Sequence, residues 1–208
     1  MNPLSAQSIV ETLGLVGVFL VLLAETGLLI GLVLPGDSLL FVAGVAASGV
    51  AMKAVGVQLS LPALMMGAPL AAIIGSQVGR NIGEKLGRPL FARPDGRIFS
   101  QARVKKTEDF LARYGYAKAL ILARFVPVVR TLINPIAGVI GMPKATFFKW
   151  NVIGALLWTE GVIVLGYVLG EKLKGSIDKY LLPIVAIVIV ISILPLLFGI
   201  MKERKNKA

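Results

Sequence analysis

Long apolar runs separated by polar stretches dominate the pattern of this sequence. Residues 54–79 hold no charged side chain over 26 positions, and residues 180–201 hold none over 22. A helix needs about 20 predominantly apolar residues to cross the hydrocarbon layer of a bilayer. Residues 147–170 form a third run of this length, interrupted only by Lys149 and Glu160. The pattern therefore predicts transmembrane helices at 54–79, 147–170 and 181–201.

A fourth apolar segment, at about residues 24–49, is broken at its centre by Pro35 and Gly36. Proline inside a helix removes a backbone donor and clashes with the preceding turn, so a straight helix through this point is costly. Each arm has about ten residues and is roughly 15 Å long, half of a hydrocarbon layer about 30 Å thick. The segment is therefore predicted to enter the membrane and turn back, as a re-entrant hairpin.

The charge distribution predicts a second hairpin. The chain carries a net charge of +11. Ten basic against four acidic residues lie in the linker 80–118, and the tail 202–208 is also basic. Positive loops face the cytoplasm, so an even number of crossings should separate these two regions. The predicted helices 147–170 and 181–201 account for both crossings, which leaves residues 119–143 to begin and end on the cytoplasmic side.

The predicted fold is an all-α integral membrane protein with one membrane domain over residues 1–208. A hairpin followed by a spanning helix occurs twice with opposite orientation, the arrangement of inverted-repeat transporters, and a C-terminal spanning helix follows. Irregular backbone at membrane depth is tolerated only inside the protein or beside water. We therefore expect the two hairpin tips to meet.

Composition excludes most other classes. The chain is 56% hydrophobic and 16% charged, with a mean hydropathy of +0.83, far from soluble averages. Cysteine and histidine are both absent, which excludes disulfides and thiolate metal sites and removes the commonest general base. We predict that the protein is not an enzyme and needs no metal or cofactor. The basic regions are explained by topology and anionic lipid rather than by nucleic acid.

Four ionisable residues fall inside the two predicted hairpins: Glu25, Asp37, Arg124 and Arg130. Burying them in a membrane costs on the order of 10 kcal/mol unless they pair or meet water. Their signs suggest that two acids on one hairpin neutralise two guanidinium groups on the other. Such pairs could simply fasten the hairpins together. Intramembrane charges more often mark a transport pathway, and arginine suits phosphate or carboxylate.

Three further polar residues lie at predicted membrane depth. Glu160 is either a third acid near the cavity or a residue of the outer interface, with Trp158 beside it as an aromatic belt residue. Asn134 and Asn151 are expected to bridge helices. Glycines recur every four residues on one helical face, which predicts close helix packing, at positions 75, 79, 83 and 87.

The motifs "ETGLLIGLVLPGDSLL", "FLARYG", "ARFVPVVRTLINPIAGVIGMPKATFFKWNVIGALLW" and "LGYVLG" resemble the bacterial DedA family, also called the SNARE-associated or VTT-domain family. The resemblance covers residues 15–170 and implies two facing re-entrant loops and lipid transport. It places the family's essential acids on Glu25 and Asp37 and its essential arginines on Arg124 and Arg130. Pro35, Gly36 and Pro127 belong to the same motifs. Ser76 stands where many members carry aspartate.

Bacterial members of the family are linked to undecaprenyl phosphate recycling, and eukaryotic relatives scramble phospholipids. The resemblance therefore implies a lipid flippase or scramblase of the bacterial inner membrane, and the basic tail predicts a cytoplasmic C-terminus. Its expected partners are protons and membrane lipids, above all undecaprenyl phosphate or a related phospholipid. Arg124 and Arg130 would bind the phosphate, while Glu25 and Asp37 exchange protons. The alternatives are a proton-coupled antiporter of small solutes or ions and a scaffold without transport; homo-oligomerisation stays open.

Overall fold

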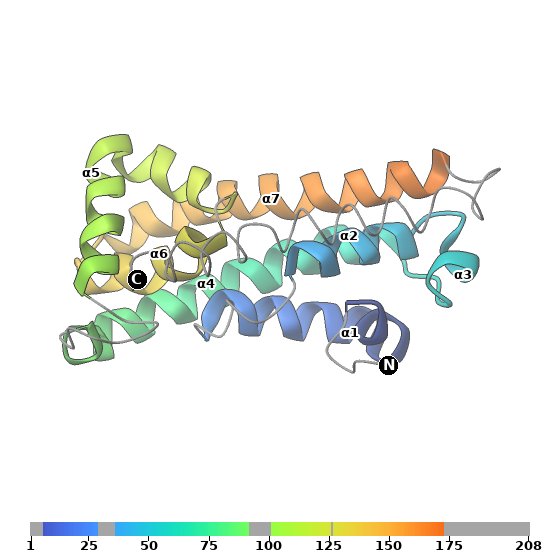
Figure 1. Cartoon of the computed structure of the whole chain (residues 1–208), viewed down its shortest axis with the longest axis horizontal. Coiled ribbons are helices and arrows are strands. Elements are labelled where there is room, and N and C mark those ends of the chain that lie inside the picture. The colour runs from blue at the N-terminus through green and yellow to red at the C-terminus, as the bar shows by residue number, and fades with distance from the viewer. Residues whose placement is uncertain (1–5, 29–35, 92–100, 126, 173–208) are drawn as a thin grey trace, which may run out of the picture. The chain divides into compact units, whose positions relative to one another are not determined.

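The computed structural model describes residues 6–28, 36–91, 101–125 and 127–172, in which all regular secondary structure is helical (Figure 1). The predicted span 181–201, the tail 202–208 and Pro35 lie outside the described residues. In chain order the helices are α1 (Ala6–Gly27), α2 (Gly36–Ala46), α3 (Ala51–Ala54), α4 (Leu61–Phe91), α5 (Gln101–Ala123), α6 (Pro127–Val139) and α7 (Lys144–Lys172).

The helices form two compact units. Unit 1 comprises Met1–Val18, Pro35–Leu64 and Val162–Ala208, and unit 2 comprises Phe19–Leu34 and Met65–Gly161. Helices α1, α4 and α7 contribute residues to both units, whereas α2 belongs to unit 1 and both α5 and α6 belong to unit 2.

Three helices are long and apolar enough to cross a membrane: α1, the Leu61–Lys85 part of α4, and α7. The predicted spans 54–79 and 147–170 fall on α4 and α7. Helix α4 begins at Leu61, later than expected, because a turn at Gly56 (φ 76°) precedes it and Ser60 caps it. The Ser60 hydroxyl accepts a hydrogen bond from the Ala63 amide at 3.5 Å. Helix α1 is a further span candidate that the sequence pattern had not separated from the first hairpin.

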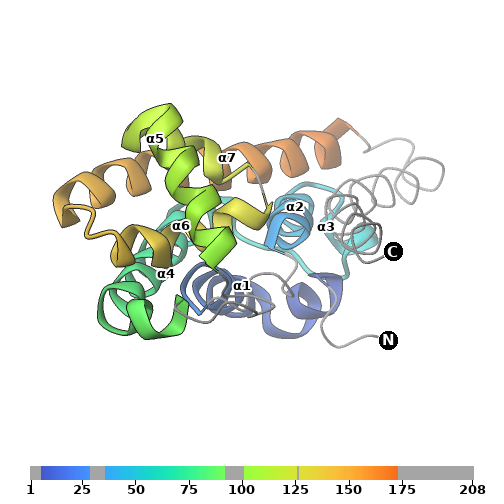
Figure 2. The same cartoon turned by 60° about the vertical axis from the view of Figure 1, so that its left-hand side comes forward.

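Each of the two predicted hairpin segments contains the end of one described helix and the start of the next. Helix α1 ends at Gly27 and α2 begins at Gly36, while α5 ends at Ala123 and α6 begins at Pro127. Proline suits the first position of a helix, where its missing N–H has no helical partner. Helix α5 also bends at Gly115 (φ 71°, ψ 160°), a left-handed conformation that favours glycine. Figure 2 shows the resulting corner between its basic first segment and its apolar second segment.

In unit 2, α5 packs against α6 and the start of α7 through an apolar core. This core contains Leu111, Ala119, Leu120, Ala123, Ile133, Ala137, Met142 and Phe147. The chain passes from α6 to α7 through a tight turn, in which Gly141 has φ 69° and the Met142 amide donates to the Ala137 carbonyl at 2.9 Å. The core therefore joins α5, α6 and the turn after α6 into one packed body.

Helix α6 crosses α4 within unit 2 at backbone contact. A β-carbon on Gly138 would overlap the Arg80 carbonyl oxygen and lie 2.6 Å from the Glu84 amide nitrogen. A β-carbon on Gly83 would likewise overlap the Pro135 carbonyl oxygen. Each helix therefore needs glycine where it meets the other.

Helix α2 crosses the second half of α7 within unit 1 in the same way. A β-carbon on Gly44 would overlap the Ile163 carbonyl oxygen and lie 3.1 Å from the Tyr167 amide nitrogen. A β-carbon on Gly166 would overlap the Phe41 carbonyl oxygen. In both crossings the shorter helix presents its glycine between residues i and i+4 of the longer helix. The longer helix has its own glycine at i+3, which is Gly83 or Gly166. This glycine faces the carbonyl of the residue three positions before the glycine of the shorter helix.

Candidate functional site

A buried ion pair joins two of the four charges predicted from the sequence. Glu25, near the end of α1, has a side chain that is 1% exposed, and Arg130, in the first turn of α6, is 8% exposed. Arg130 Nη2 donates to Glu25 Oε1 at 2.7 Å. Each charge offsets the cost of burying the other, since an unpaired charge at this depth would be strongly destabilising.

Arg124 is held by neutral groups. It follows the last turn of α5 and is buried, and its Nη2 donates to Ser76 Oγ at 3.1 Å and to Asn151 Oδ1. The Ser76 hydroxyl in turn donates to the Ala72 carbonyl at 2.8 Å, and Asn151 Nδ2 donates to the Ile73 carbonyl at 3.3 Å. The expected neutralisation of both arginines by acids thus takes a different form within unit 2: Glu25 pairs with Arg130, and polar groups tied to α4 hold Arg124.

One face of α7 touches the arginines. Trp158 is 2% exposed, and its ring lies 4.8 Å from Arg130 Cζ and 6.0 Å from Arg124 Cζ. Gly154, one turn earlier, leaves room for Arg124, because a β-carbon there would lie 3.1 Å from Arg124 Cδ. With Asn151, these residues line a single helical face. Trp158 is therefore a wall of the arginine site rather than an aromatic belt residue, and its π face favours the cations.

The predicted helix bridge at Asn134 is present. Asn134 Nδ2 donates to the Thr26 carbonyl at 3.0 Å, which joins α6 to the end of α1. The predicted glycine face of α4 lies at the same junction. A β-carbon on Gly75 would lie 2.6 Å from the Leu23 carbonyl oxygen, and one on Gly79 would lie 3.2 Å from that of Gly27. The glycines thus bring α1 close to α4, while Asn134 ties α6 to α1.

The other predicted residues are placed as follows. Asp37 is half-buried in the first turn of α2, in unit 1, and Gly36 begins that helix. Pro127 begins α6. Glu160 is half-buried on α7, and its Oε2 is buried without a hydrogen-bond partner among the described residues.

The sequence interpretation missed a third buried arginine. Arg80 is 2% exposed, although it had been assigned to the basic linker. Its Nη2 donates to the Met142 carbonyl at 2.5 Å and its Nη1 to Glu84 Oε2 at 2.9 Å. Lys144 Nζ lies 3.6 Å from the same Glu84 oxygen. The sequence signal for this burial is its spacing: Arg80 lies four residues, or one helical turn, after Ser76, so both share one helix face.

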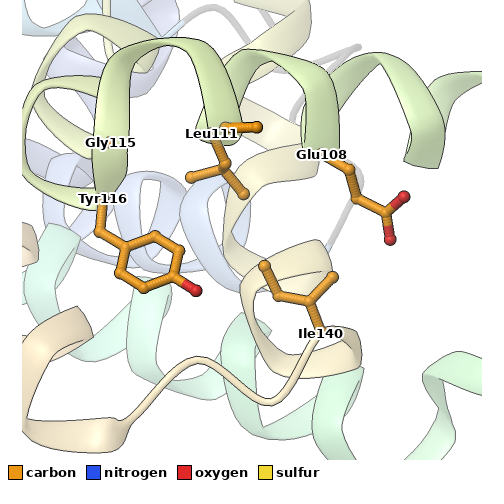
Figure 3. Close-up of a pocket in the computed structure, with 6 residues that line it drawn as sticks. Glu108, Leu111, Gly115, Tyr116 and Ile140 are labelled. Atoms are coloured by element: carbon orange, nitrogen blue, oxygen red, sulfur yellow. The ribbon is translucent and has the colours of Figure 1, made fainter.

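A separate pocket of about 430 Å³ opens at the corner of α5. Figure 3 shows Glu108 and Tyr116 at its two sides, with Leu111 and Ile140 between them. None of the residues predicted for the site lines it. We therefore centre the candidate site on the buried charges of unit 2.

Those charges give the site its electrostatic character. Two guanidinium groups and one carboxylate, from Arg124, Arg130 and Glu25, add up to one excess positive charge (+2 and −1). Arginine forks suit planar or tetrahedral oxyanions, and a buried positive charge favours an anion as its partner. The arrangement can therefore bind an anionic group such as a phosphate.

Comparison with known proteins shows the family. The VTT domain matches residues 13–168 of this chain. Protein DedA of Escherichia coli K12 is 40% identical over 190 residues, which covers 91% of this chain and 83% of DedA. The chain belongs to the DedA family. An uncharacterised membrane protein of Mycobacterium tuberculosis H37Rv is 34% identical over 99% of this chain and 88% of its own length.

A relative from Mycobacterium leprae, also named an uncharacterised membrane protein, is 33% identical over 86% of this chain and 76% of its own length. No solved structure matches the chain. The names of these relatives and the three apolar helices agree that this DedA-family chain is a multi-pass membrane protein.

Proposed function

We propose that this DedA-family protein moves phosphorylated lipids across the bilayer, with undecaprenyl phosphate or a related phospholipid as its substrate. The observation that carries the proposal is the buried site of unit 2, where Arg124 and Arg130 flank one tryptophan ring, Glu25 pairs with Arg130 and neutral groups hold Arg124. An excess positive charge inside a membrane protein is costly unless it serves an anion. A lipid phosphate is the anion that a membrane supplies in quantity.

The contacts of each arginine suggest its part in transport. Arg130 is paired with Glu25, so protonation of Glu25 would remove this counter-charge from the guanidinium and favour a phosphate in its place. Arg124 is bonded to Ser76 and Asn151, which are neutral, so protonation of Glu25 leaves these partners unchanged. The proposed cycle therefore exchanges a proton on Glu25 for a phosphate on Arg130, and Arg124 holds that phosphate. Asp37 is proposed as the second proton-exchanging acid, and Glu160 as a supporting one.

The proposal includes two inverted repeats with re-entrant hairpins, in the inner membrane of a bacterium and with a cytoplasmic C-terminus. The matched glycine crossings support it: α2 meets α7 in unit 1 and α6 meets α4 in unit 2 with the same register. Equal registers are expected when two segments descend from one repeated design.

The hairpin can be tested by labelling, since the native chain has no cysteine. Single cysteines at the exposed positions Lys118 and Lys144 flank the second hairpin. Both should react with a membrane-impermeant maleimide from the same side of oriented vesicles. Labelling from opposite sides would show that the segment crosses the membrane, and the inverted repeat would be excluded.

Transport itself is tested with purified protein in liposomes that contain a fluorescent polyprenyl phosphate. We expect flipping by the wild type and its loss in Arg124→Ala, Arg130→Ala and Asp37→Asn. Lys85→Gln, which removes an exposed charge of α4, is the matched control and should flip at the wild-type rate. Wild-type flipping in all three site variants would exclude the proposal. Proton-coupled ion flux in lipid-independent assays, unaffected by Arg→Lys changes, would instead support the antiporter alternative.

A further inference from the structure

Helix α4 carries a line of contacts that leads away from Arg124. Ser76, Arg80 and Glu84 are spaced by four residues and therefore share one face, each about 6 Å further along the helix axis. Ser76 holds Arg124, Arg80 is itself a buried cation, and Glu84 lies beside Lys144. Positive groups thus occur at three successive levels of one helix face in unit 2, ending at the basic linker.

At the level of Arg80, one buried donor lacks a hydrogen-bond partner among the described residues. Arg80 Nη1 and Nη2 bind Glu84 and Met142, but its Nε is buried and has no hydrogen-bond partner among the described residues. A buried N–H of a charged group that lacks an acceptor is destabilising, so an oxygen that accepted from it would stabilise the cluster.

The charges around this donor also favour an anion. Arg80, Glu84 and Lys144, which we call the Arg80 cluster, sum to one positive charge (+2 and −1). Lys144 is 71% exposed and Glu84 is 41% exposed, so the cluster extends from a buried guanidinium to an open ammonium. An anion that enters from the surface meets Lys144 first and Arg80 second.

We propose that the Arg80 cluster is a second phosphate site, which binds the headgroup of an anionic lipid between the membrane surface and the Arg124 site. It rests on the proposed function for its place in the path, but its own binding can be measured separately. Phosphate oxygen accepts from Arg80 Nε, and Lys144 Nζ contributes the second positive charge. The headgroup then has two binding positions along α4. One lies at the level of Arg80, and the second lies one helical turn away, at the level of Ser76.

The test uses the full chain in detergent with a fluorophore on Ala145→Cys, an exposed position beside Lys144 in a chain with no native cysteine. Dioctanoyl phosphatidic acid is titrated, with dioctanoylglycerol as the lipid without phosphate and inorganic phosphate as the phosphate without lipid. We expect saturable binding of phosphatidic acid and no response to dioctanoylglycerol. A response to inorganic phosphate alone would overturn the assignment to a lipid.

Two variants test whether phosphatidic acid binds at the Arg80 cluster. Arg80→Gln should lower the affinity for phosphatidic acid about tenfold, because it removes a charge-assisted hydrogen bond. Lys144→Gln should lower the same affinity about fivefold, because it removes one positive charge near the anion. Lys144 is exposed, so its variant decides the question if Arg80→Gln does not fold. Lys85→Gln, one residue beyond Glu84 on α4, is the matched control and should bind like the wild type. Wild-type affinity in both site variants overturns the site.

The outcome is separable from that of the proposed function. If Arg124→Ala stops flipping while Arg80→Gln and Lys144→Gln bind phosphatidic acid normally, the transporter proposal stands and the second site is wrong. If both variants lose binding while the wild type flips nothing, the second site stands and transport is wrong.

Discussion

Units 1 and 2 contain the same kind of helix crossing with different chemistry around it. In unit 1, Gly44 meets the backbone of α7 at Ile163, an apolar residue that is fully buried. In unit 2, Gly138 meets the backbone of α4 at Arg80, a buried cation that also binds the Met142 carbonyl. The glycines set the distance between the helices in both units, and the side chains beside them decide what each crossing can do.

The short helices differ in the same way. Every residue of α2 except Asp37 is buried and uncharged, whereas α6 carries Arg130 and Asn134, both buried and both bonded to α1 within unit 2. Packing therefore does not require the charges, since α2 makes its crossing without buried basic residues. The charges of unit 2 are better explained by a task than by stability, because buried ion pairs are poor stabilisers.

The largest effect should come from breaking the ion pair of unit 2. Arg130→Met leaves Glu25 buried without its cation, which should lower the free energy of unfolding by about 3–5 kcal/mol. Leu39→Met, at a fully buried position of α2, should cost less than about 1.5 kcal/mol. Thermal unfolding in detergent measures both. The double variant Glu25→Gln, Arg130→Met should recover part of the loss, and equal melting of Arg130→Met and wild type would contradict the buried pair.

Much of the fold follows from local chemistry. Pro35 and Gly36 predict an interruption near the residue where α2 begins, and apolar runs of sufficient length predict α4 and α7. The start of α4 was misjudged because hydropathy alone cannot distinguish a helix from the apolar turn before it. Ser60 and Gly56, which set that start, are short-range signals that a count of charges overlooks.

The site was only partly accessible to sequence reasoning. Charge identifies Glu25, Arg124 and Arg130, because an ionisable side chain in an apolar run is costly. Their partners are less visible: Ser76 is uncharged, and its role depends on which helix faces Arg124. Arg80 was missed because its charge placed it in the linker, whereas the structure continues α4 through it and buries it. Only tertiary packing tells a buried linker residue from an exposed one.

The smallest effect tests whether the two crossings are equivalent. Gly44→Ala and Gly138→Ala each place a methyl group against a carbonyl oxygen, so each should lower the free energy of unfolding by about 1–3 kcal/mol. Gly161→Ala is the control on α7: a β-carbon there meets nothing within 4 Å, so higher helix propensity should raise stability by up to about 1 kcal/mol. Thermal unfolding again gives the values. If Gly138→Ala destabilises the protein and Gly44→Ala does not, α2 can shift away from α7 but α6 cannot shift away from α4. The two crossings would then have the same register without the same need for glycine. Equal losses of unfolding free energy would mean that both units need the glycine for packing. A larger loss of lipid flipping in Gly138→Ala would then place the proposed phosphate path in unit 2.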